Sequence, residues 1–338
     1  MSGERVAVLG AGAFGTAVSM VLHANGASVR VWGRSPERVR RLQEVRENER
    51  YLPGVPLPAD LFLTPSADEA LDGARIVVVA VPTQFIRVTL ESLASALGKA
   101  SEGAVFLSLA KGIEKKTRLR ASEVLSQVLG APSRRIAVLS GPSHAEELAR
   151  DLPTTVVVAC TAEETARTMQ ALLGNEILRV YTSQDVLGVE LGGALKNVIA
   201  VAAGICDGLG LGDNSKAALL TRGLSEITRL GTALGADPAT FFGLSGVGDL
   251  IATCYSPFGR NREVGERIGK GEILEQVLAS MEKVAEGVFT VQAACELAGD
   301  HDLEMPIARE MHCILFEGKD PRLAVRDLML RDPKPETA

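Results

Sequence analysis

The chain has 338 residues, a length that suits two domains, and its content of 46% hydrophobic and 23% charged residues excludes a disordered protein. Its net charge of −6, with dispersed basic residues, argues against a nucleic acid or an anionic membrane surface as a partner. The five cysteines lie far apart and the four histidines lack metal-ligand spacing, so we expect reduced thiols, a cytoplasmic location and no metal.

The first half of the chain alternates short β-branched runs with helix-like segments. Such alternation predicts a mainly parallel sheet covered by helices on both faces. The expected strands are Val6–Leu9, Ser28–Trp32, Ile76–Val81, Val105–Leu109, Ile136–Leu139 and Thr155–Ala159, with weaker patterns at 61–64 and 178–181. The expected helices cover residues 13–24, 36–47, 84–97, 118–129 and 162–173.

After about residue 185 the pattern becomes helical, without a convincing strand. The expected helices there cover residues 186–206, 214–234, 261–269, 272–279, 290–299 and 306–317. The sequence therefore predicts an α/β domain at 1–184, an all-helical domain at 185–330 and a disordered tail at 331–338.

Neither a signal peptide nor membrane insertion is expected. The N-terminal residues lead straight into a strand, which is not the pattern of a signal peptide. The most apolar long stretch, 186–206, contains Glu190, Lys196 and Asn197, which a membrane span tolerates poorly. We interpret this stretch as a buried helix that carries a site.

A glycine-rich segment, Gly10-Ala-Gly12-Ala-Phe-Gly15, lies between the first strand and the first helix. In a G-x-G-x-x-G pattern Gly10 permits the tight turn, Gly12 lets the backbone approach a pyrophosphate, and Gly15 allows close packing of helix on strand. The helix N-terminus then favours the anion. Alone, the pattern also fits a structural turn, but its context favours a dinucleotide site in a Rossmann-type, doubly wound sheet.

The end of the second strand bears on the choice of cofactor. An NAD-specific site usually carries an acidic residue there, whereas this chain has Gly33 followed by Arg34. A guanidinium can pair with a 2′-phosphate, which indicates NADP or tolerance of both NADP and NAD. The alternative is that Arg34 is an ordinary solvated arginine.

Lys196 is the most informative single residue. On a helix it shares a face with small and apolar residues, among them Gly192, Gly193 and Ile199. A lysine in such a place is buried or faces a cavity, and desolvation lowers its pKa enough for a general base near neutral pH. Snorkelling to the surface is the alternative, and the position alone does not decide between the two.

Four other segments have the look of functional loops. Two follow strands at 108–112 and 140–146, a third places an acid in a glycine-rich turn at 246–250, and 259–262 is a basic cluster at a helix start, suited to an anion. For any one of these, an ordinary turn or cap explains the residues equally simply.

Together the motifs are more specific. The order GAGAFGTA, SLAKGIE, GPSHAEE, ELGGALKNVIAVAAGI, GVGDLIATC, GRNR and KVAEGVFT resembles bacterial NAD(P)-dependent glycerol-3-phosphate dehydrogenases from about residue 5 to residue 325. The resemblance implies interconversion of sn-glycerol 3-phosphate and dihydroxyacetone phosphate, a small phosphate substrate, by hydride transfer with NADP or NAD. It also implies a supply of glycerol 3-phosphate for phospholipid synthesis, and a homodimer.

The resemblance also implies roles for individual residues. Lys196 matches the catalytic proton acceptor. Our hypothesis for the mechanism is that Lys111 helps to lower the pKa of Lys196 and that Asp249 orients either Lys196 or a substrate hydroxyl. The substrate-binding positions are Lys111, Gly141, Ser143, Lys196, Asp249, Gly259, Arg260 and Asn261. The cofactor-binding positions are Gly10, Gly12, Ala13, Phe14, Gly15, Arg34, Tyr51, Lys111, Ala145, Arg260, Val284 and Glu286, and the supporting ones are Asn197 and Thr253.

Two positions depart from the family pattern. Gly259 stands where serine is frequent, so only its backbone could contact a phosphate there, and Phe14 stands where many members have tryptophan.

Two other functions compete with this one. A β-hydroxyacid or ketopantoate-type reductase would share the two-domain plan but act on a carboxylate, against which the basic 259–262 cluster and the acid at 249 argue. A non-catalytic NADP sensor would need no buried base, so the apolar setting of Lys196 argues against it.

Overall fold

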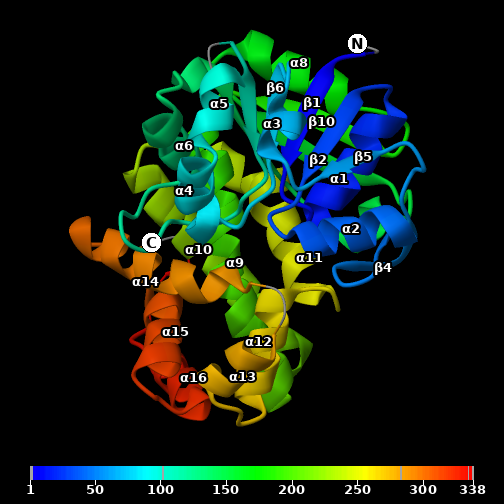
Figure 1. Ribbon diagram of the computed structural model, residues 1–338. Coiled ribbons are helices and arrows are strands. Elements are labelled where there is room, and N and C mark those ends of the chain that lie inside the picture. The colour runs from blue at the N-terminus through cyan, green and yellow to red at the C-terminus, as the bar shows by residue number, and fades with distance from the viewer. Residues whose placement is uncertain (1–2, 101–102, 282–283, 334, 337–338) are drawn as a thin grey trace.

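A computed structural model describes residues 3–100, 103–281, 284–333 and 335–336. It has two lobes, a sheet flanked by helices and a second lobe built from helices (Figure 1). The sheet lobe holds the first half of the chain, and the long helix that follows it joins the lobes.

One large sheet forms the centre of the first lobe. Its strands are β1 (Arg5–Leu9), β2 (Ser28–Trp32), β5 (Phe62–Thr64), β6 (Ile76–Val79), β7 (Val105–Ser108), β8 (Ile136–Ser140), β9 (Thr154–Ala159) and β10 (Leu178–Ser183). They lie in the order β10-β9-β8-β7-β6-β1-β2-β5, and only the β8–β9 pair is antiparallel. Each strand expected from the sequence is in this sheet, so the mainly parallel arrangement is confirmed.

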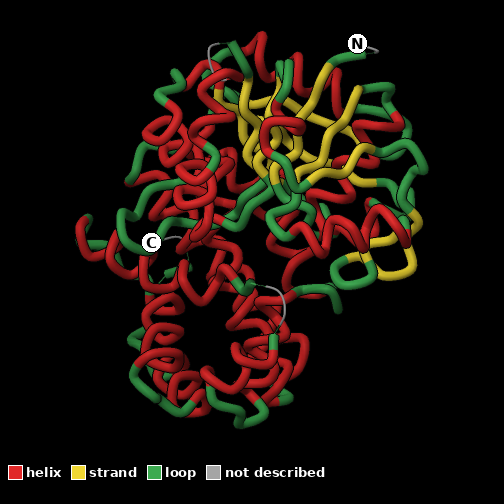
Figure 2. Tube along the Cα trace, in the orientation of Figure 1, coloured by secondary structure: helices red, strands yellow, loops and turns green. Residues whose placement is uncertain are grey.

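Helices cover both faces of this sheet (Figure 2). They are α1 (Ala13–Ala24), α2 (Pro36–Val45), α3 (Ala67–Leu71), α4 (Thr83–Ser92), α5 (Ala94–Ala100), α6 (Ala121–Leu129), α7 (Ala145–Leu148) and α8 (Glu163–Leu173). Successive side chains of β1 point to opposite faces: Val6 and Val8 pack into a core with α1 and α8, and Ala7 and Leu9 into a core with α3 to α6. The doubly wound prediction is confirmed.

A short hairpin follows α2 and was not expected. The prediction of a helix over 36–47 was wrong at its end, because Arg46 adopts a left-handed conformation (φ 54°) that stops the helix after Val45. The chain then forms the antiparallel pair β3 (Glu47–Asn48) and β4 (Leu52–Pro56).

Two other helix predictions in this half were wrong in their bounds. The single helix expected over 84–97 is divided at Leu93, whose ψ of 8° leaves the helical range. The helix expected from 118 begins at Ala121, because Arg118 has a positive φ of 60° and a bridge between Ile113 and Arg120 holds the preceding residues in a turn.

The second half is helical throughout the described residues, as predicted. Its helices are α9 (Val186–Leu209), α10 (Gly212–Ala233), α11 (Asp249–Tyr255), α12 (Arg260–Gly269), α13 (Leu274–Ser280), α14 (Glu286–Asp300), α15 (Pro306–Phe316) and α16 (Pro321–Met329), with a 3₁₀ turn at Pro238–Phe242 and a π turn at Leu244–Gly248. Helix α16 was missed, although Asp320 and Pro321 form a recognisable helix start.

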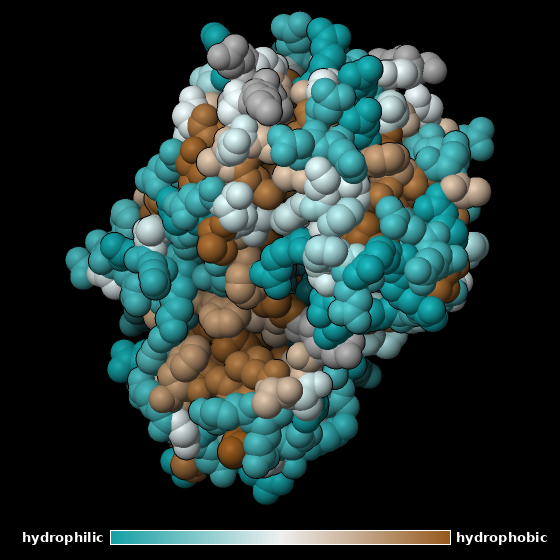
Figure 3. All heavy atoms as spheres, in the orientation of Figure 1, coloured by the Kyte–Doolittle hydropathy of each residue, from teal (hydrophilic) through white to brown (hydrophobic). Residues whose placement is uncertain are grey.

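The transition from sheet to helices falls between β10 and α9. The division into domains at 184 is compatible with it and stays a prediction, as does the disordered tail, of which residues 334 and 337–338 lie outside the described part of the chain. On the face seen in Figure 3, hydrophilic residues cover most of both lobes, and hydrophobic ones gather in the hollow of the helical lobe.

Helix α9 is the central element of the second lobe. It is long and apolar enough to span a membrane, but 89% of its most apolar window is buried inside the protein, so the prediction of a buried helix is confirmed. Glycines allow the backbone of α9 to contact the backbone of α12. A Cβ on Gly204 would lie 1.9 Å from a carbonyl oxygen of α12, and a Cβ on Gly265 would lie 1.9 Å from a carbonyl oxygen of α9. This contact fixes the two helices that carry Lys196 and Arg260.

We predict that Gly204→Ala lowers the free energy of unfolding by about 1–3 kcal/mol or more, because the added methyl group forces α9 and α12 apart. Gly299→Ala is the matched control, since Gly299 is an exposed glycine of α14 at which an added Cβ would have nothing within 4 Å. Urea unfolding of both variants measures the difference. Equal stabilities would contradict the close α9–α12 contact.

Candidate functional site

A cleft of about 700 Å³ lies where the carboxyl ends of β1, β2, β6 and β7 face α9, α11, α12 and α14. In parallel α/β sheets this edge is where ligands bind. All the site residues predicted from the sequence line the cleft, with the exception of Gly141. The carbonyl of Gly141 instead accepts a hydrogen bond from Lys111 Nζ at 2.8 Å.

The glycine-rich turn is shaped as a cradle. Gly10 has a φ of 119°, and a Cβ there would lie 2.5 Å from the carbonyl oxygen of Ala80. A Cβ on Gly15 would lie 2.1 Å from the Gly10 carbonyl oxygen, which is the close packing of helix on strand. Gly12 begins α1 with open space around it and no side-chain cap, so the first N–H groups of the helix are free to bind a phosphate. The residues fit a dinucleotide.

The unexpected hairpin supports this cradle. The buried side chain of Asn48 donates hydrogen bonds to the Ala11 carbonyl at 3.1 Å and to Thr16 Oγ1 at 2.8 Å. Asn48 thereby places Tyr51 in the cleft, where the phenol oxygen accepts a hydrogen bond from Arg38 at 3.2 Å. The hairpin therefore positions one predicted cofactor residue.

Several arginines line the part of the cleft beside the end of β2. Arg34 is exposed and follows β2 directly, and Arg38 and Arg50 line the same part of the cleft. Arg38 and Arg50 were not predicted from the sequence. Arg38 lies in the first turn of α2, which directly follows Arg34.

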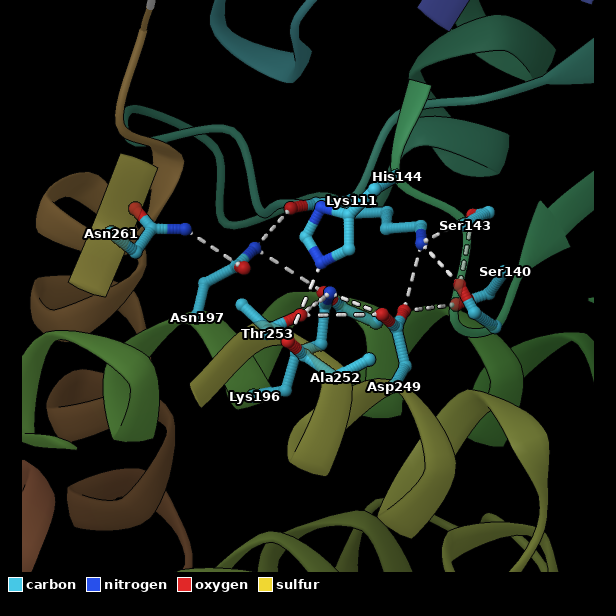
Figure 4. Close-up of polar contacts among 12 residues, drawn as sticks. Lys111, Ser140, Ser143, His144, Lys196, Asn197, Asp249, Ala252, Thr253 and Asn261 are labelled. Atoms are coloured by element: carbon cyan, nitrogen blue, oxygen red, sulfur yellow. Dashed lines mark hydrogen bonds and ion pairs between the residues drawn. The ribbon is translucent and has the colours of Figure 1, made fainter. Parts of the chain in front are cut away.

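The chemical centre is a carboxylate shared by two lysines (Figure 4). Lys196 Nζ on α9 lies 2.5 Å from Asp249 Oδ1, and Lys111 Nζ, in the loop after β7, lies 2.8 Å from Asp249 Oδ2. Thr253, one turn after Asp249 on α11, accepts a further hydrogen bond from Lys196. Lys111 also donates to Ser143 Oγ at 3.3 Å. Of the two alternatives left open for Lys196, burial is the one observed, because only 5% of the residue is exposed.

Burial sets the protonation of this centre. It lowers the pKa of Lys196 from 10.5 to about 8, with the positive charge of Lys111 acting in the same direction and Asp249 against it. Burial opposes the charge on Asp249, but the two ammonium groups outweigh it and hold the pKa of that carboxyl below its ordinary value. Lys196 is therefore a base that can exchange a proton near neutral pH.

Small residues make room for this arrangement. A Cβ on Gly193 would lie 2.7 Å from Ser140 Oγ, and one on Gly192 would lie 2.6 Å from the Ser245 carbonyl oxygen. The glycines beside Lys196 thus allow α9 to touch the end of β8 and the turn before α11. Ser140, a residue not assigned from the sequence, lies 3.5 Å from Asp249 Oδ2 and helps to hold that carboxylate.

The basic cluster at the start of α12 is divided. Arg260 is exposed in the cleft, where its guanidinium donates to the Val284 carbonyl at 2.9 Å. Arg262 does not line the cleft, because it pairs with Asp207 at 2.9 Å and Glu266 at 3.0 Å. Arg262 therefore does not belong to the anion site predicted at 259–262, which stays a prediction for residues 259–261.

Two further predicted positions, Gly259 and Glu286, make contacts that bear on the residue type found there. A Cβ on Gly259 would lie 2.8 Å from the Thr253 carbonyl oxygen, so this tight turn favours glycine over serine. Glu286, the first residue of α14, accepts a hydrogen bond from the Thr83 N–H at 2.7 Å and so links the two lobes across the cleft. Within the described residues no cluster of three or more metal-ligating side chains occurs.

A phosphate cradle that faces a buried lysine across one cleft defines a dinucleotide-dependent dehydrogenase. The family models for NAD-dependent glycerol-3-phosphate dehydrogenase match residues 5–166 (N-terminal part) and 185–326 (C-terminal part). The chain belongs to this family, and its cofactor is NAD or NADP.

Individual proteins agree with the family models. The glycerol-3-phosphate dehydrogenase [NAD(P)+] of Geobacillus kaustophilus is 51% identical over 334 residues, 98% of this chain and 96% of that protein. That of Listeria monocytogenes is 48% identical over 337 residues, 99% of each chain. The crystal structure of glycerol-3-phosphate dehydrogenase from Coxiella burnetii superposes with a TM-score of 0.91 at 36% identity, covering 97% of this chain and 99% of that one.

We predict that Arg34→Ala weakens NADPH binding by roughly 10- to 100-fold and leaves NADH binding almost unchanged, because it removes a charged hydrogen-bond donor for a 2′-phosphate. Arg40→Ala is the matched control: this exposed arginine of α2 does not line the cleft. Fluorescence titration with each nucleotide measures both affinities. An equal loss for NADPH and NADH would assign Arg34 to another role.

Proposed function

We propose that this chain interconverts sn-glycerol 3-phosphate and dihydroxyacetone phosphate with Lys196 as the proton acceptor and donor. The observation that carries the proposal is the pair of lysines on the Asp249 carboxylate, Lys196 buried and Lys111 partly buried, in the same cleft as the dinucleotide cradle. The family relationship gives the substrate, and the geometry of the described residues supports the role that we propose for each of them.

The proton moves through Lys196. In the oxidative direction its neutral amine takes the proton of the C2 hydroxyl, and in the reductive direction its ammonium returns one to the alkoxide oxygen. When bound, the nicotinamide cofactor accepts or supplies the hydride. Asp249 and Thr253 fix the direction of the Lys196 amine, since both lie within hydrogen-bond distance of Nζ. A positioned general base or acid of this kind contributes about 10²- to 10⁴-fold to a rate.

Lys111 has an electrostatic role. Its ammonium group shares Asp249 with Lys196, so it favours the neutral form of Lys196 and stabilises negative charge on the reacting oxygen. Its hydrogen bonds to the Gly141 carbonyl and Ser143 keep the ammonium at the edge of the cleft. We assign Gly141 to this positioning of Lys111.

The phosphate of the substrate is placed at the start of α12. Arg260 supplies a guanidinium, Asn261 an amide, and the N-terminus of this ten-residue helix a partial positive charge. Gly259 at the helix start adds only its backbone, as expected from the sequence. These donors are of the kind that bind the phosphate of a phosphate ester.

The family relationship alone supports three further parts of the proposal. They are a cytoplasmic location, assembly as a homodimer, and use of the product glycerol 3-phosphate in phospholipid synthesis.

The substrate assignment is tested by NADPH oxidation in the presence of dihydroxyacetone phosphate or of ketopantoate. We expect turnover with the phosphate ester and little with the carboxylate. A preference for ketopantoate would place the chain among reductases of that type, and turnover of neither compound with intact NADPH binding would favour a sensor.

Lys196→Ala tests the proton acceptor. Turnover of dihydroxyacetone phosphate should fall about 10²-fold or more, since the variant lacks its general acid, while NADPH binding stays intact. Lys270→Ala is the control, because Lys270 is a lysine at the exposed end of α12. Near-normal turnover in Lys196→Ala would overturn the assignment.

The pH dependence should have opposite signs in the two directions. The folded-state pKa of Lys196 is lowered to about 8, so the neutral base accumulates as pH rises through 8. We therefore predict that kcat for glycerol 3-phosphate oxidation rises through about pH 8 and that kcat for dihydroxyacetone phosphate reduction falls through the same range. Initial-rate profiles in both directions measure this, and a common sign would contradict proton transfer through Lys196.

A further inference from the structure

Three amide groups form a continuous chain of hydrogen bonds beside the lysines. The Gly287 N–H donates to Asn261 Oδ1, Asn261 Nδ2 donates to Asn197 Oδ1, and Asn197 Nδ2 donates to the Lys111 carbonyl, each at 2.9 Å. Figure 4 shows the last two of these bonds. We call this chain, from Gly287 through Asn261 and Asn197 to Lys111, the amide relay.

The relay is buried and has one direction. Asn197 and Asn261 are 5% and 8% exposed, so their amides need protein partners. Every member donates towards Lys111, and aligned hydrogen bonds in a low-dielectric interior polarise and strengthen one another. Turning either side-chain amide around would place two donors or two acceptors face to face, so each amide fixes the next.

The two ends of the relay lie in different functional segments. At one end is the backbone of Lys111, whose side chain is bound to Asp249. At the other end is Gly287, next to Glu286 at the start of α14. Gly287 packs so closely that a Cβ there would lie 2.5 Å from the Asn197 carbonyl oxygen. A shift of α14 would therefore displace Asn197 and Asn261.

A second path returns from α14 to the lysine loop. Glu286 accepts a hydrogen bond from the Thr83 N–H at the start of α4. The next residue of α4, Gln84, binds the loop that follows β7 and carries Lys111. Gln84 Nε2 donates to the Ile113 carbonyl at 2.7 Å, and its Oε1 accepts the Lys115 N–H at 3.0 Å. The segments that carry the lysine, the phosphate-binding residues and the cofactor-binding Glu286 thus belong to one closed circuit of hydrogen bonds.

Asn261 connects this circuit to the substrate. It lies beside Arg260 at the start of α12 and lines the cleft. Its Nδ2 group carries two hydrogens, of which the relay uses one, so the same amide can also donate to a bound anion. Occupation of the anion site and the position of α14 therefore act on one side chain.

We propose that Asn197 is a positioning residue that couples the substrate and cofactor sites, so that glycerol 3-phosphate raises the affinity for NADPH and NADPH raises the affinity for glycerol 3-phosphate. The effect is reciprocal by linkage. A phosphate on Arg260 and Asn261 orders the relay, which holds Glu286 and Lys111 in their ligand-binding positions. The inference rests on the proposed function for the identity of the two ligands.

The experiment is a nucleotide titration that avoids turnover. NADPH and glycerol 3-phosphate are both in the reduced state, so they bind together without reacting. The dissociation constant of NADPH is measured by fluorescence without and with saturating glycerol 3-phosphate, and the ratio of the two values is the coupling. We expect a ratio of roughly 5 or more in the unaltered protein.

In Asn197→Leu the side chain keeps a similar size but loses both relay bonds. We expect the ratio to fall to 1, because Asn261 is then no longer connected to Lys111 through a side chain. Asn197→Asp, which keeps the acceptor for Asn261 and loses the donor to Lys111, provides the same test if the leucine variant does not fold. Asn214→Leu, at an exposed asparagine of α10, should leave the ratio unchanged.

If Asn197 only stabilised the fold or only contacted the substrate, its loss would weaken folding or substrate binding. The ratio of NADPH dissociation constants, measured at saturating glycerol 3-phosphate, would then stay above 1. An unchanged ratio in both Asn197 variants, or a ratio of 1 in the unaltered protein, would overturn the proposal. Failure of the proposed function is seen separately, as absence of turnover with dihydroxyacetone phosphate in the unaltered protein.

Discussion

The site depends on one carboxylate that neutralises two ammonium groups away from water. Asp249 accepts from Lys196 on one oxygen and from Lys111 on the other. Two lysines this close would repel each other, and their burial without an anion would be costly. The shared carboxylate makes the pair stable, yet leaves one net positive charge in the cleft, which favours an anionic substrate and a base with a lowered pKa.

The rest of the fold serves to bring these three residues together from three distant segments. Lys111 follows a strand of the sheet, Lys196 lies in the middle of the buried helix α9, and Asp249 begins α11. Glycines in α9 allow the backbone contacts that this meeting requires. The dinucleotide cradle lies at the same sheet edge, because the carboxyl ends of parallel strands meet there. Chemistry and cofactor binding thus share one cleft between the lobes.

Much of this could be predicted from residues that are close in sequence. Alternating strand and helix patterns give the doubly wound sheet, and the fingerprint around Gly12 gives the cradle. What escaped prediction depends on contacts between distant segments. Nothing local shows that Arg262 pairs with Asp207, that Asn48 supports the turn at Ala11, or that Asn261 is held by Gly287. Local sequence left open whether Lys196 is buried or extends to the surface, and the structure shows it buried against Asp249.

Burial and Lys111 together make Lys196 a base near neutral pH despite its carboxylate partner. The most direct test is a titration of Lys196 by NMR, with the resonance assigned from its loss in Lys196→Met. We expect this titration to give a pKa of about 8. A pKa at or above the ordinary lysine value of 10.5 would contradict it, because Lys196 would then be permanently charged and unable to accept a proton from the substrate.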